Sequence, residues 1–557
     1  MSINKGLRHT KRLQEILNAF LRNGLSHFLH RIGLTNRVKD EEADPEINMN
    51  TKDIGVKLRR SLQELGPAFI KLGQMASTRR DFVPEEIAHE LEKLQDEVES
   101  ISFEKIRSIV EQELGNSLEN LFKSFSEIPL ATASIGQVHL AELHTGEHVA
   151  IKVQRPDIKP IVENDLEILH GITGLMESRL KWAKNYHLQK RLDEFADSLR
   201  EELDYRIEGR NCDRISKQFE KDKTVHIPKI YWEFTTKNVL TMERIQGIKV
   251  TNVAKLEAAG LNRKLIAKRL ADSIFQQVLM AGTFHGDPHA GNIFVMPGNV
   301  ISYIDFGMVG KMSEDLRYHF VSLLLDLKKG DSRGIINTFQ KMDILEDEEN
   351  TYSLQKDLDM LIAKYYDVSL SNISLGNVMG EIFVIAYRNK VQLPEGITLL
   401  GKAILTMEDI MDKLDPSFSI MKAVEPFAEK LVKERYRPDN IARHAWDRML
   451  EDTEILFSLP RNLRDIMGLV KKGKIRLDIN VTELQTLLLR MDKISNRVSF
   501  SIILLAFSIL MAGLIIGASI SGQTTMLWRL PVIEIGSIIA SLMFLFMVFS
   551  IFRSGRM

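Results

Sequence analysis

Two segments near the middle of the chain, each combining a few polar residues with short apolar runs, constrain its fold more than any other feature of the sequence. Residues 280–295 read MAGTFHGDPHAGNIFV, and residues 300–307 read VISYIDFG. Asp287 precedes Asn292 by five positions and Asp305 by 18. Carboxylate and amide oxygens are the ligands that Mg²⁺ takes beside phosphates, and phosphoryl transfer also needs a carboxylate near the attacking hydroxyl. The three side chains supply these groups in the required order, which predicts a phosphoryl-transfer site.

Two histidines in the first segment could suggest a metal site, because His285 and His289 have the i, i+4 spacing of a helical ligand pair. The Gly-Asp-Pro sequence between them argues against a helix at this point. We therefore expect both histidines to have a structural role in the loop.

A β-hairpin with a lysine on its second strand is predicted upstream of these segments. Residues 135–143 and 148–153 each alternate in polarity, and the turn His-Thr-Gly-Glu separates them. The second strand reads VAIK, so that Lys152 projects from an otherwise apolar run. A strand lysine usually points to solvent, but one in this tetrad, after a loop of small residues, is typical of a phosphate contact. Lys152 is therefore a candidate catalytic and nucleotide-binding residue.

The loop before the hairpin reads ATASIG at residues 131–136 and occupies the place of a glycine-rich phosphate loop. Alanine keeps the side chains small, but each Cβ restricts φ and limits how closely the backbone can approach a ligand. We therefore expect a stiffer, differently shaped cover over the phosphates. The candidate nucleotide-binding residues of this loop are Ala131, Ala133, Ser134 and Gly136.

Two further motifs give the chain a resemblance to a known family. Residues 65–77 read LGPAFIKLGQMAS, which contains KxGQ, and residues 201–211 read EELDYRIEGRN, which contains ExD. Together with PLATASIGQVH, VAIKVQRP, HGDPHAGN and DFG, they make roughly residues 50–440 resemble the UbiB/AarF family of atypical protein-kinase-like proteins. The resemblance implies an α+β, protein-kinase-like two-lobed fold with an N-terminal helical KxGQ extension.

The resemblance also implies roles for individual residues, with ATP and Mg²⁺ (or Mn²⁺) as cofactors. Lys152 and Asp287 match the family's catalytic positions. Asn292 and Asp305 match its metal ligands, and Glu208 matches the glutamate that pairs with the strand lysine. Because Lys152 and Glu208 are far apart in the sequence, any pairing between them must be tertiary.

The hinge beside adenine would correspond, by the same resemblance, to Glu243 through Ile245. The KxGQ and ExD motifs match regulatory positions, which are Lys71, Gln74, Glu202 and Asp204. In such proteins the glutamate of ExD faces the lysine of KxGQ, and the KxGQ helices lie where a protein kinase admits a peptide. From the residues alone, the acidic positions would instead be a solvated helix face, and the lysine would extend its ammonium group to water.

The resemblance implies a membrane-anchored, kinase-like ATPase or phosphotransferase that supports ubiquinone or other quinone and isoprenoid-lipid biosynthesis. No APE motif follows the DFG, and a helical pattern begins at Ser313, so the long activation loop that supports peptide substrates is missing. Small-molecule kinases of the aminoglycoside and choline-kinase type, which also carry HGDxxxxN loops, are one alternative. A nucleotide-gated, non-catalytic lipid-binding module is another.

Two long apolar segments near the C-terminus predict two transmembrane helices. Residues 498–522 contain no charged residue, and 530–552 contain only Glu534, while about 20 residues suffice to cross a bilayer. A buried helical hairpin is the alternative. Basic residues flank the outer ends, which predicts a multi-pass protein of the cell inner (cytoplasmic) membrane with its kinase-like domain in the cytoplasm. Gly513 and Gly517 form a GxxxG step through which a homodimer could pack.

The remaining regions follow from charge, from periodicity and from the resemblance. Residues 1–45 form a basic amphipathic region, suited either to an anionic membrane surface or to packing on its own domain. The KxGQ extension is expected at 46–128, the kinase-like domain at 129–440 and a membrane-proximal linker at 441–497. The formal charge of -1 excludes a chain that is basic overall, as many nucleic-acid-binding proteins are. We expect no nucleic acid as a partner, and the resemblance implies ATP and membrane lipids, including quinone or isoprenoid precursors.

Overall fold

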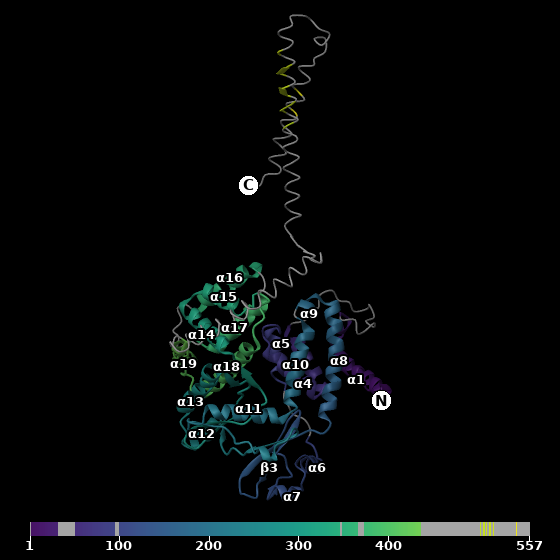
Figure 1. The fold of residues 1–557 in the computed structure, drawn as a ribbon, viewed down its shortest axis with the longest axis vertical. Coiled ribbons are helices and arrows are strands. Elements are labelled where there is room, and N and C mark those ends of the chain that lie inside the picture. The colour runs from purple at the N-terminus through teal and green to yellow at the C-terminus, as the bar shows by residue number, and fades with distance from the viewer. Residues whose placement is uncertain are drawn as a thin grey trace, which may run out of the picture. The chain divides into compact units, whose positions relative to one another are not determined.

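The computed structural model describes residues 2–31, 51–94, 100–185, 187–345, 348–365 and 373–435, with scattered positions between 502 and 542. The chain divides into two compact units, Met1–Arg443 and His444–Met557, and the elements described below belong to the first (Figure 1). Within the described part, no helix is long and apolar enough to span a membrane. Most of the predicted spans at 498–522 and 530–552 lies outside the described residues, and the predicted linker at 441–497 lies wholly outside them.

Helices make up most of the chain before the first sheet. They are α1 (Ser2–Arg22), α2 (Ser26–Arg31), α3 (Thr51–Leu65), α4 (Pro67–Thr78), α5 (Glu85–Leu91), α6 (Phe103–Leu114) and α7 (Leu118–Leu121). Helix α4 starts sharply because Gly66 has a φ of 91° and Pro67 occupies the first helical position. A Cβ at Gly73 of α4 would overlap Leu94 and lie 2.8 Å from Leu62, so the glycine of KxGQ lets α4 pack closely against its neighbours.

Helix α1 packs on its own domain, which is one of the two interpretations that its amphipathic sequence allows. Ile16 and Ala19 are buried in the main core. Arg12 donates from Nε and an Nη atom to the carboxylate of Asp165, at 2.7 and 2.9 Å, and from Nη to the Leu65 carbonyl at 2.7 Å. Asp165 is almost fully buried, so this bidentate contact fixes α1 against the following helices.

Arg12→Ala should destabilise the protein by about 3 kcal/mol, because the truncation leaves the Asp165 carboxylate buried without its charge partner. The neighbouring exposed Lys11→Ala is the control and should change the free energy of unfolding by less than about 0.5 kcal/mol. Urea denaturation of both variants measures the difference. Equal stability of the two variants would show that α1 does not depend on this contact.

The first sheet is small and antiparallel. Its strands are β1 (Ser124–Phe125), β2 (Ala131–Thr132), β3 (Gly136–Glu142), β4 (His148–Gln154) and β6 (Val239–Glu243), in the order β1-β3-β4-β6 with β2 also paired to β3. The predicted hairpin is confirmed, since β3 and β4 pair from Gly136↔Gln154 to Glu142↔His148. Gly146, with a φ of 97°, provides the left-handed residue of its turn.

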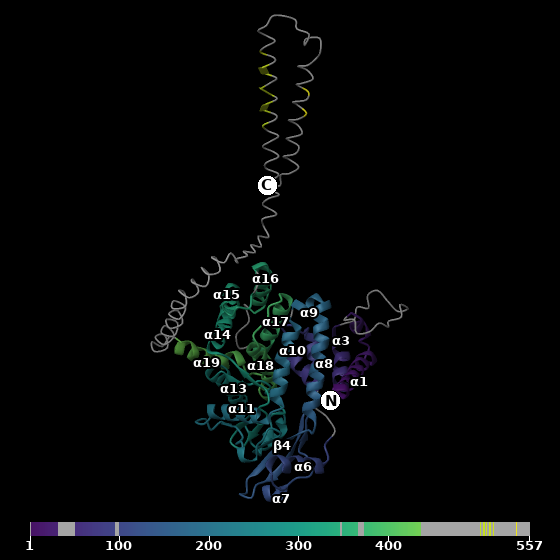
Figure 2. The same cartoon turned by 45° about the vertical axis from the view of Figure 1, so that its right-hand side comes forward.

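Four helices separate β4 from β6 along the chain and carry the ExD region. They are α8 (Ile158–Arg179), α9 (Lys181–Asn185), α10 (Leu188–Glu202) and α11 (Tyr205–Gln218). Asp204 accepts a hydrogen bond from the Arg206 backbone and so caps α11. Figure 2 shows α8 and α10 side by side, and α10 also contacts α4. The KxGQ and ExD motifs are therefore brought together by helix packing.

The second lobe combines short strands with many helices. Its strands are β5 (Val225–His226), β7 (Ile248–Lys249), β8 (Thr283–His285), β9 (Ile293–Met296), β10 (Val300–Tyr303) and β11 (Val309–Lys311). Its α-helices are α12 (Val253–Ala258), α13 (Arg263–Phe275), α14 (Glu314–Lys329), α15 (Ser332–Lys341), α16 (Glu348–Tyr365), α17 (Leu375–Arg388), α18 (Glu395–Leu414) and α19 (Ile420–Arg435). A 3-10 turn at Trp232–Phe234 and a π-helical turn at Gln276–Ala281 complete the described elements.

Two pairs of strands flank the segments that contain Asp287 and the DFG. β9 pairs antiparallel with β10, and β8 pairs antiparallel with β11. The segment containing Asp287 therefore connects β8 to β9, and the DFG connects β10 to β11. Ser313 caps α14 by accepting from the Leu316 backbone at 3.2 Å, so a helix follows β11 directly, as predicted.

Candidate active site

The two predicted metal residues and one of the two predicted catalytic residues, Asp287, converge on one cavity, whereas Lys152 does not line it. Asp287, Asn292 and Asp305 all line a cavity of about 2530 Å³. The two loops are tied together, because the Ile304 backbone N–H donates to the Asn292 carbonyl at 3.1 Å. The Gly307 N–H donates to Asp305 Oδ1 at 3.0 Å, which fixes the carboxylate of the DFG.

The two loop histidines bond to backbone groups of their own loop. The Asp287 N–H donates to His285 Nδ1 at 3.2 Å, and the Gly291 N–H donates to His289 Nδ1 at 3.0 Å. Burial lowers the pKa of His285 to about 4, so that this ring is neutral near pH 7 and can accept. Among the described residues no three His, Cys, Asp or Glu side chains form a metal-ligand group.

Lys152 of β4 and Glu208 of α11 form a buried ion pair. Nζ lies 3.0 Å from Oε1 and 2.8 Å from Oε2, and the two side chains are only 15% and 7% exposed. The ring of Tyr205 lies against the ammonium group, with its centroid 5.1 Å from Nζ. Burial alone would lower the pKa of Lys152, but the charges of Glu208 and Asp305 raise it well above its ordinary value. Lys152 is therefore a fixed cation.

The field of Lys152 extends to the DFG aspartate. Burial would raise the pKa of Asp305, but the charge of Lys152 and the hydrogen bond from Gly307 hold it well below its usual range. The carboxylate is therefore ionised at neutral pH. Asp305 and the Asn292 amide supply one charged and one neutral oxygen ligand, a set that Mg²⁺ completes with phosphates and water.

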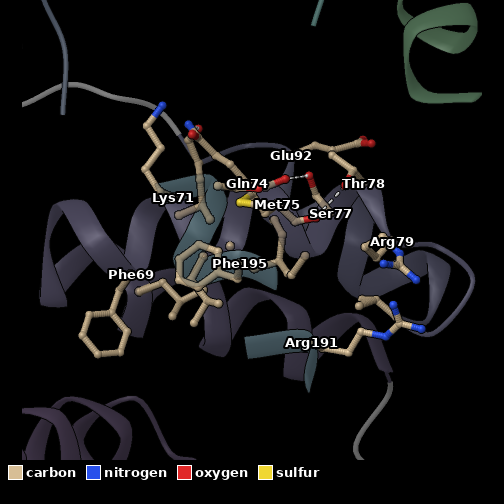
Figure 3. Close-up of a pocket in the computed structure, with 18 of the residues that line it drawn as sticks. Phe69, Lys71, Gln74, Met75, Ser77, Thr78, Arg79, Glu92, Arg191 and Phe195 are labelled. Atoms are coloured by element: carbon tan, nitrogen blue, oxygen red, sulfur yellow. Dashed lines mark hydrogen bonds between the residues drawn. The ribbon is translucent and has the colours of Figure 1, made fainter. Parts of the chain in front are cut away.

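The KxGQ and ExD motifs meet at the same cavity. Lys71 Nζ of α4 lies 2.6 Å from Glu202 Oε1 at the end of α10, and both line the cavity with Gln74. Gln74 Nε2 donates to the Leu94 carbonyl at 3.3 Å. Figure 3 shows Lys71 and Gln74 pointing to the same side, away from the ring of Phe69.

Asp204, the second acidic residue of ExD, has a local role. Its carboxylate pairs with the Arg206 side chain at 2.6 and 2.9 Å in addition to capping α11. These contacts lower the pKa of Asp204, with the Arg206 side chain as the largest cause. Asp204 thus positions the start of the helix that carries Glu208.

The ATASIG loop folds as a tight turn. Ala131 and Thr132 pair with β3, and the Ala133 N–H donates to the Gly136 carbonyl at 2.7 Å. Gly136 has a packing role, because a Cβ there would overlap the Tyr205 hydroxyl and lie 2.6 Å from the Val153 carbonyl oxygen. The sequence predicts Gly136 only as a phosphate-loop residue, and this requirement of Tyr205 is a separate reason for glycine.

Two buried hydroxyls in this region suit a polyanionic ligand. Ser134 Oγ and Tyr205 Oη have no hydrogen-bond partner within the part of the chain that the structure describes. Tyr205 lies against Lys152, and Ser134 lies in the predicted phosphate loop. Buried hydroxyls normally find a partner. Together with the fixed Lys152 cation, they fit the phosphate groups of a nucleotide.

The predicted hinge residues, like Lys152, Glu208 and the residues of the ATASIG loop, do not line the cavity that contains Asp287. Glu243 ends β6, opposite Val149 of β4. Its carboxylate contacts His226 Nε2 at 3.0 Å and accepts from the Lys229 N–H at 3.2 Å, so the side chain is already engaged. Ile245 follows in the connection to β7. If this segment binds adenine, its backbone N–H and C=O groups would have to make the contact, because the Glu243 side chain is already bonded.

Two residues at the site are absent from the sequence prediction. Tyr205 follows the ExD motif directly, and this adjacency to an assigned motif is a signal that could have identified it. Lys402 of α18 forms an ion pair with Asp287, with Nζ 3.2 Å from Oδ1. A lone lysine in an apolar helix is indistinguishable by pattern from a surface lysine, so the sequence contains no such signal for it.

Gly136→Ala should destabilise the protein by about 1–3 kcal/mol, because the added methyl group forces Tyr205 or β4 to move. Gly171→Ala is a matched control within α8, where a Cβ would meet nothing within 4 Å, and it should be neutral or stabilise by up to about 1 kcal/mol. Thermal unfolding of both variants compares them. A Gly136→Ala variant as stable as Gly171→Ala would contradict the packing role.

The sequence matches three family descriptions along its length. These are ABC1 atypical kinase-like domain at residues 93–339, UbiB helical domain at 358–419 and ABC1/UbiB kinase-like C-terminal domain at 482–553. The UbiB helical domain and C-terminal domain matches lie beyond the last strand described above. Helix α18 falls within the UbiB helical domain match.

Similar proteins occur in bacteria and plants. A probable protein kinase UbiB of Xanthomonas oryzae pv. oryzae is 32% identical over 468 residues, which cover 82% of this chain and 84% of that protein. The uncharacterized protein sll1770 of Synechocystis sp. is 35% identical and covers 78% of this chain and 75% of its own length. Protein ACTIVITY OF BC1 COMPLEX KINASE 7, chloroplastic, of Arabidopsis thaliana is 34% identical, with 76% and 62% covered.

Proposed function

Because the chain belongs to the UbiB/AarF family of atypical kinase-like proteins, we propose that it is an ATPase or phosphotransferase that uses ATP with Mg²⁺. The observation that carries this proposal is the buried Lys152–Glu208 pair, whose charge keeps Asp305 ionised beside Asn292 and Asp287. This set has the charges and oxygen ligands that phosphoryl transfer needs. The presence of all four residues, Lys152, Asp287, Asn292 and Asp305, weighs against a non-catalytic protein.

The chain's own residues would act as follows. Lys152 would bind phosphate oxygens, in the orientation that Glu208 imposes on it. Asn292 and Asp305 would hold the metal ion, which would neutralise negative charge on the phosphates. Asp287 would accept a hydrogen bond from the attacking water or hydroxyl.

Two features of the chain favour a small molecule or water over a peptide as the phosphoryl acceptor. The DFG leads through β11 directly into α14, so the described chain has no long loop there to support a peptide. In addition, Lys71, Gln74 and Glu202 of α4 and α10 line the cavity that contains Asp287. In the family that the chain resembles, such helices lie where a protein kinase admits a peptide, which supports a small acceptor.

We propose further that the activity supports quinone or other isoprenoid-lipid metabolism at the cytoplasmic face of the inner membrane. Apolar side chains of α1 and α8 support this, because they line the same cavity as the catalytic residues: Ile16, Leu17, Phe20, Leu169, Ile172 and Met176. A ligand reaching Asp287 through this region would meet an apolar wall, as a lipid would require.

Asp305→Asn should lower Mg²⁺-dependent ATP turnover by about 100-fold or more, because loss of a metal ligand removes several kcal/mol of charge stabilisation. Asp272→Asn, on the exposed side of α13, is the control and should keep full turnover. Phosphate release from the purified full chain measures both variants. Full turnover in Asp305→Asn would overturn the assignment of this site.

ATP turnover by the full chain, with and without anionic vesicles containing an isoprenoid phenol, tests the lipid proposal. We expect several-fold stimulation by the phenol-containing vesicles and inorganic phosphate as the product. Stoichiometric phosphorylation of a soluble polar alcohol would instead indicate a small-molecule kinase. Nucleotide binding with no turnover under either condition would indicate a nucleotide-gated module.

A further inference from the structure

Helix α18 brings a lysine directly to the catalytic loop. Lys402 Nζ lies 3.2 Å from Asp287 Oδ1, and the two side chains are 17% and 32% exposed. Both residues line the large cavity. The helix falls within the part of the chain that matches the UbiB helical domain, beyond the residues that match the kinase-like domain.

The position of Lys402 is fixed by packing. Leu399, one helical turn before it, lies against the catalytic loop, because a Cβ at Gly286 would lie 2.8 Å from Leu399 Cδ2. Ala403 and Ile404, which follow it, are buried in the main core. By contrast, Lys413 of the same helix is 56% exposed and pairs with Asp409. Lys402 is therefore held at the site by the rigid helix, and Lys413 is an ordinary surface lysine.

Two other lysines near the site are paired with carboxylates other than that of Asp287. Lys152 is paired with Glu208, and Lys71 is paired with Glu202. The loop between Asp287 and Asn292 contains neither lysine nor arginine. A phosphate group that approaches the Asp287 and Asp305 carboxylates needs nearby cations to offset their repulsion. Lys402 is the lysine whose partner is the catalytic aspartate itself.

We propose that Lys402 binds the terminal phosphate of ATP. On nucleotide binding, its ammonium group exchanges the Asp287 carboxylate for phosphate oxygens, and Asp287 becomes available to the attacking water or hydroxyl. The inference rests on the proposed function, because it assigns a further residue to the same nucleotide site. It makes the helical region after the kinase-like domain part of that site, and it distinguishes ATP from ADP, which lacks the terminal phosphate.

The test measures nucleotide affinity rather than turnover. Fluorescence titration of the full chain in the presence of Mg²⁺ would compare the non-hydrolysable β,γ-imido analogue of ATP with ADP. Lys402→Met should weaken binding of the ATP analogue by about tenfold, the effect of losing one charge-assisted contact, and leave ADP affinity within about twofold. Lys402→Arg keeps the charge and should retain most of the preference for the ATP analogue. Lys413→Met is the matched control on the same helix and should leave both affinities unchanged.

An unchanged ratio of the two affinities in Lys402→Met, whether both fall together or neither falls, would overturn the role of Lys402. Thermal unfolding identifies a variant that fails to fold, and Lys402→Gln, which keeps a hydrogen-bond donor but not the charge, then serves for the same comparison and should lose the preference. The wild-type titration separates this inference from the proposed function. If the wild type binds neither nucleotide, both fail, whereas normal wild-type binding with an unchanged ratio in the variant overturns only the inference.

Discussion

The buried ion pair between Lys152 and Glu208 is the interaction on which the rest of the site depends. Removing two charges from water is costly, and the cost is offset only when each charge is well paired. At 2.8 and 3.0 Å the carboxylate meets this condition with both oxygens. Because the two residues come from β4 and α11, the pair also fixes the helix against the sheet. The resulting cation then keeps Asp305 ionised in a half-buried position.

Neighbouring residues pack around this ion pair and hold its two side chains in position. Tyr205 lies against the ammonium group, and its hydroxyl fills the space where Gly136 lacks a side chain. Asp204 caps the helix that carries Glu208. Beyond the pair, α4 and α18 also line the cavity, where Lys71 is paired with Glu202 and Lys402 with Asp287. The loop that contains Asp287 is therefore in contact with a helix from outside its own two strands.

The sequence predicts the parts of this site that are local. Asp287, Asn292 and Asp305 lie in two short segments between strands, and their spacing was enough to place them together. The hairpin and its lysine follow from strand alternation in the same way. The tertiary pairs are different, since periodicity cannot show which carboxylate faces Lys152 or Lys71. Only the resemblance to a family indicated Glu208 and Glu202 as their partners.

Other features could not be predicted because their cause lies in distant packing. The need for glycine at position 136 comes from Tyr205, and the partner of Lys402 lies on a loop more than a hundred residues earlier. The amphipathic pattern of α1 fits a membrane surface as well as a protein core, and only the structure shows that it packs on the domain, through the burial of Ile16 and Ala19 and the Arg12–Asp165 contact. The membrane spans and their orientation remain predictions from the sequence.

A double-mutant cycle on Lys152 and Glu208, measured by the affinity for ATP with Mg²⁺, tests the central claim most directly. Lys152→Met and Glu208→Gln should each weaken binding, since one removes the phosphate contact and the other releases the lysine from its position. The double variant should bind no more weakly than Lys152→Met alone, with a coupling of at least about 1 kcal/mol. Losses that simply add would contradict the account, because they would mean that Glu208 does not act through Lys152.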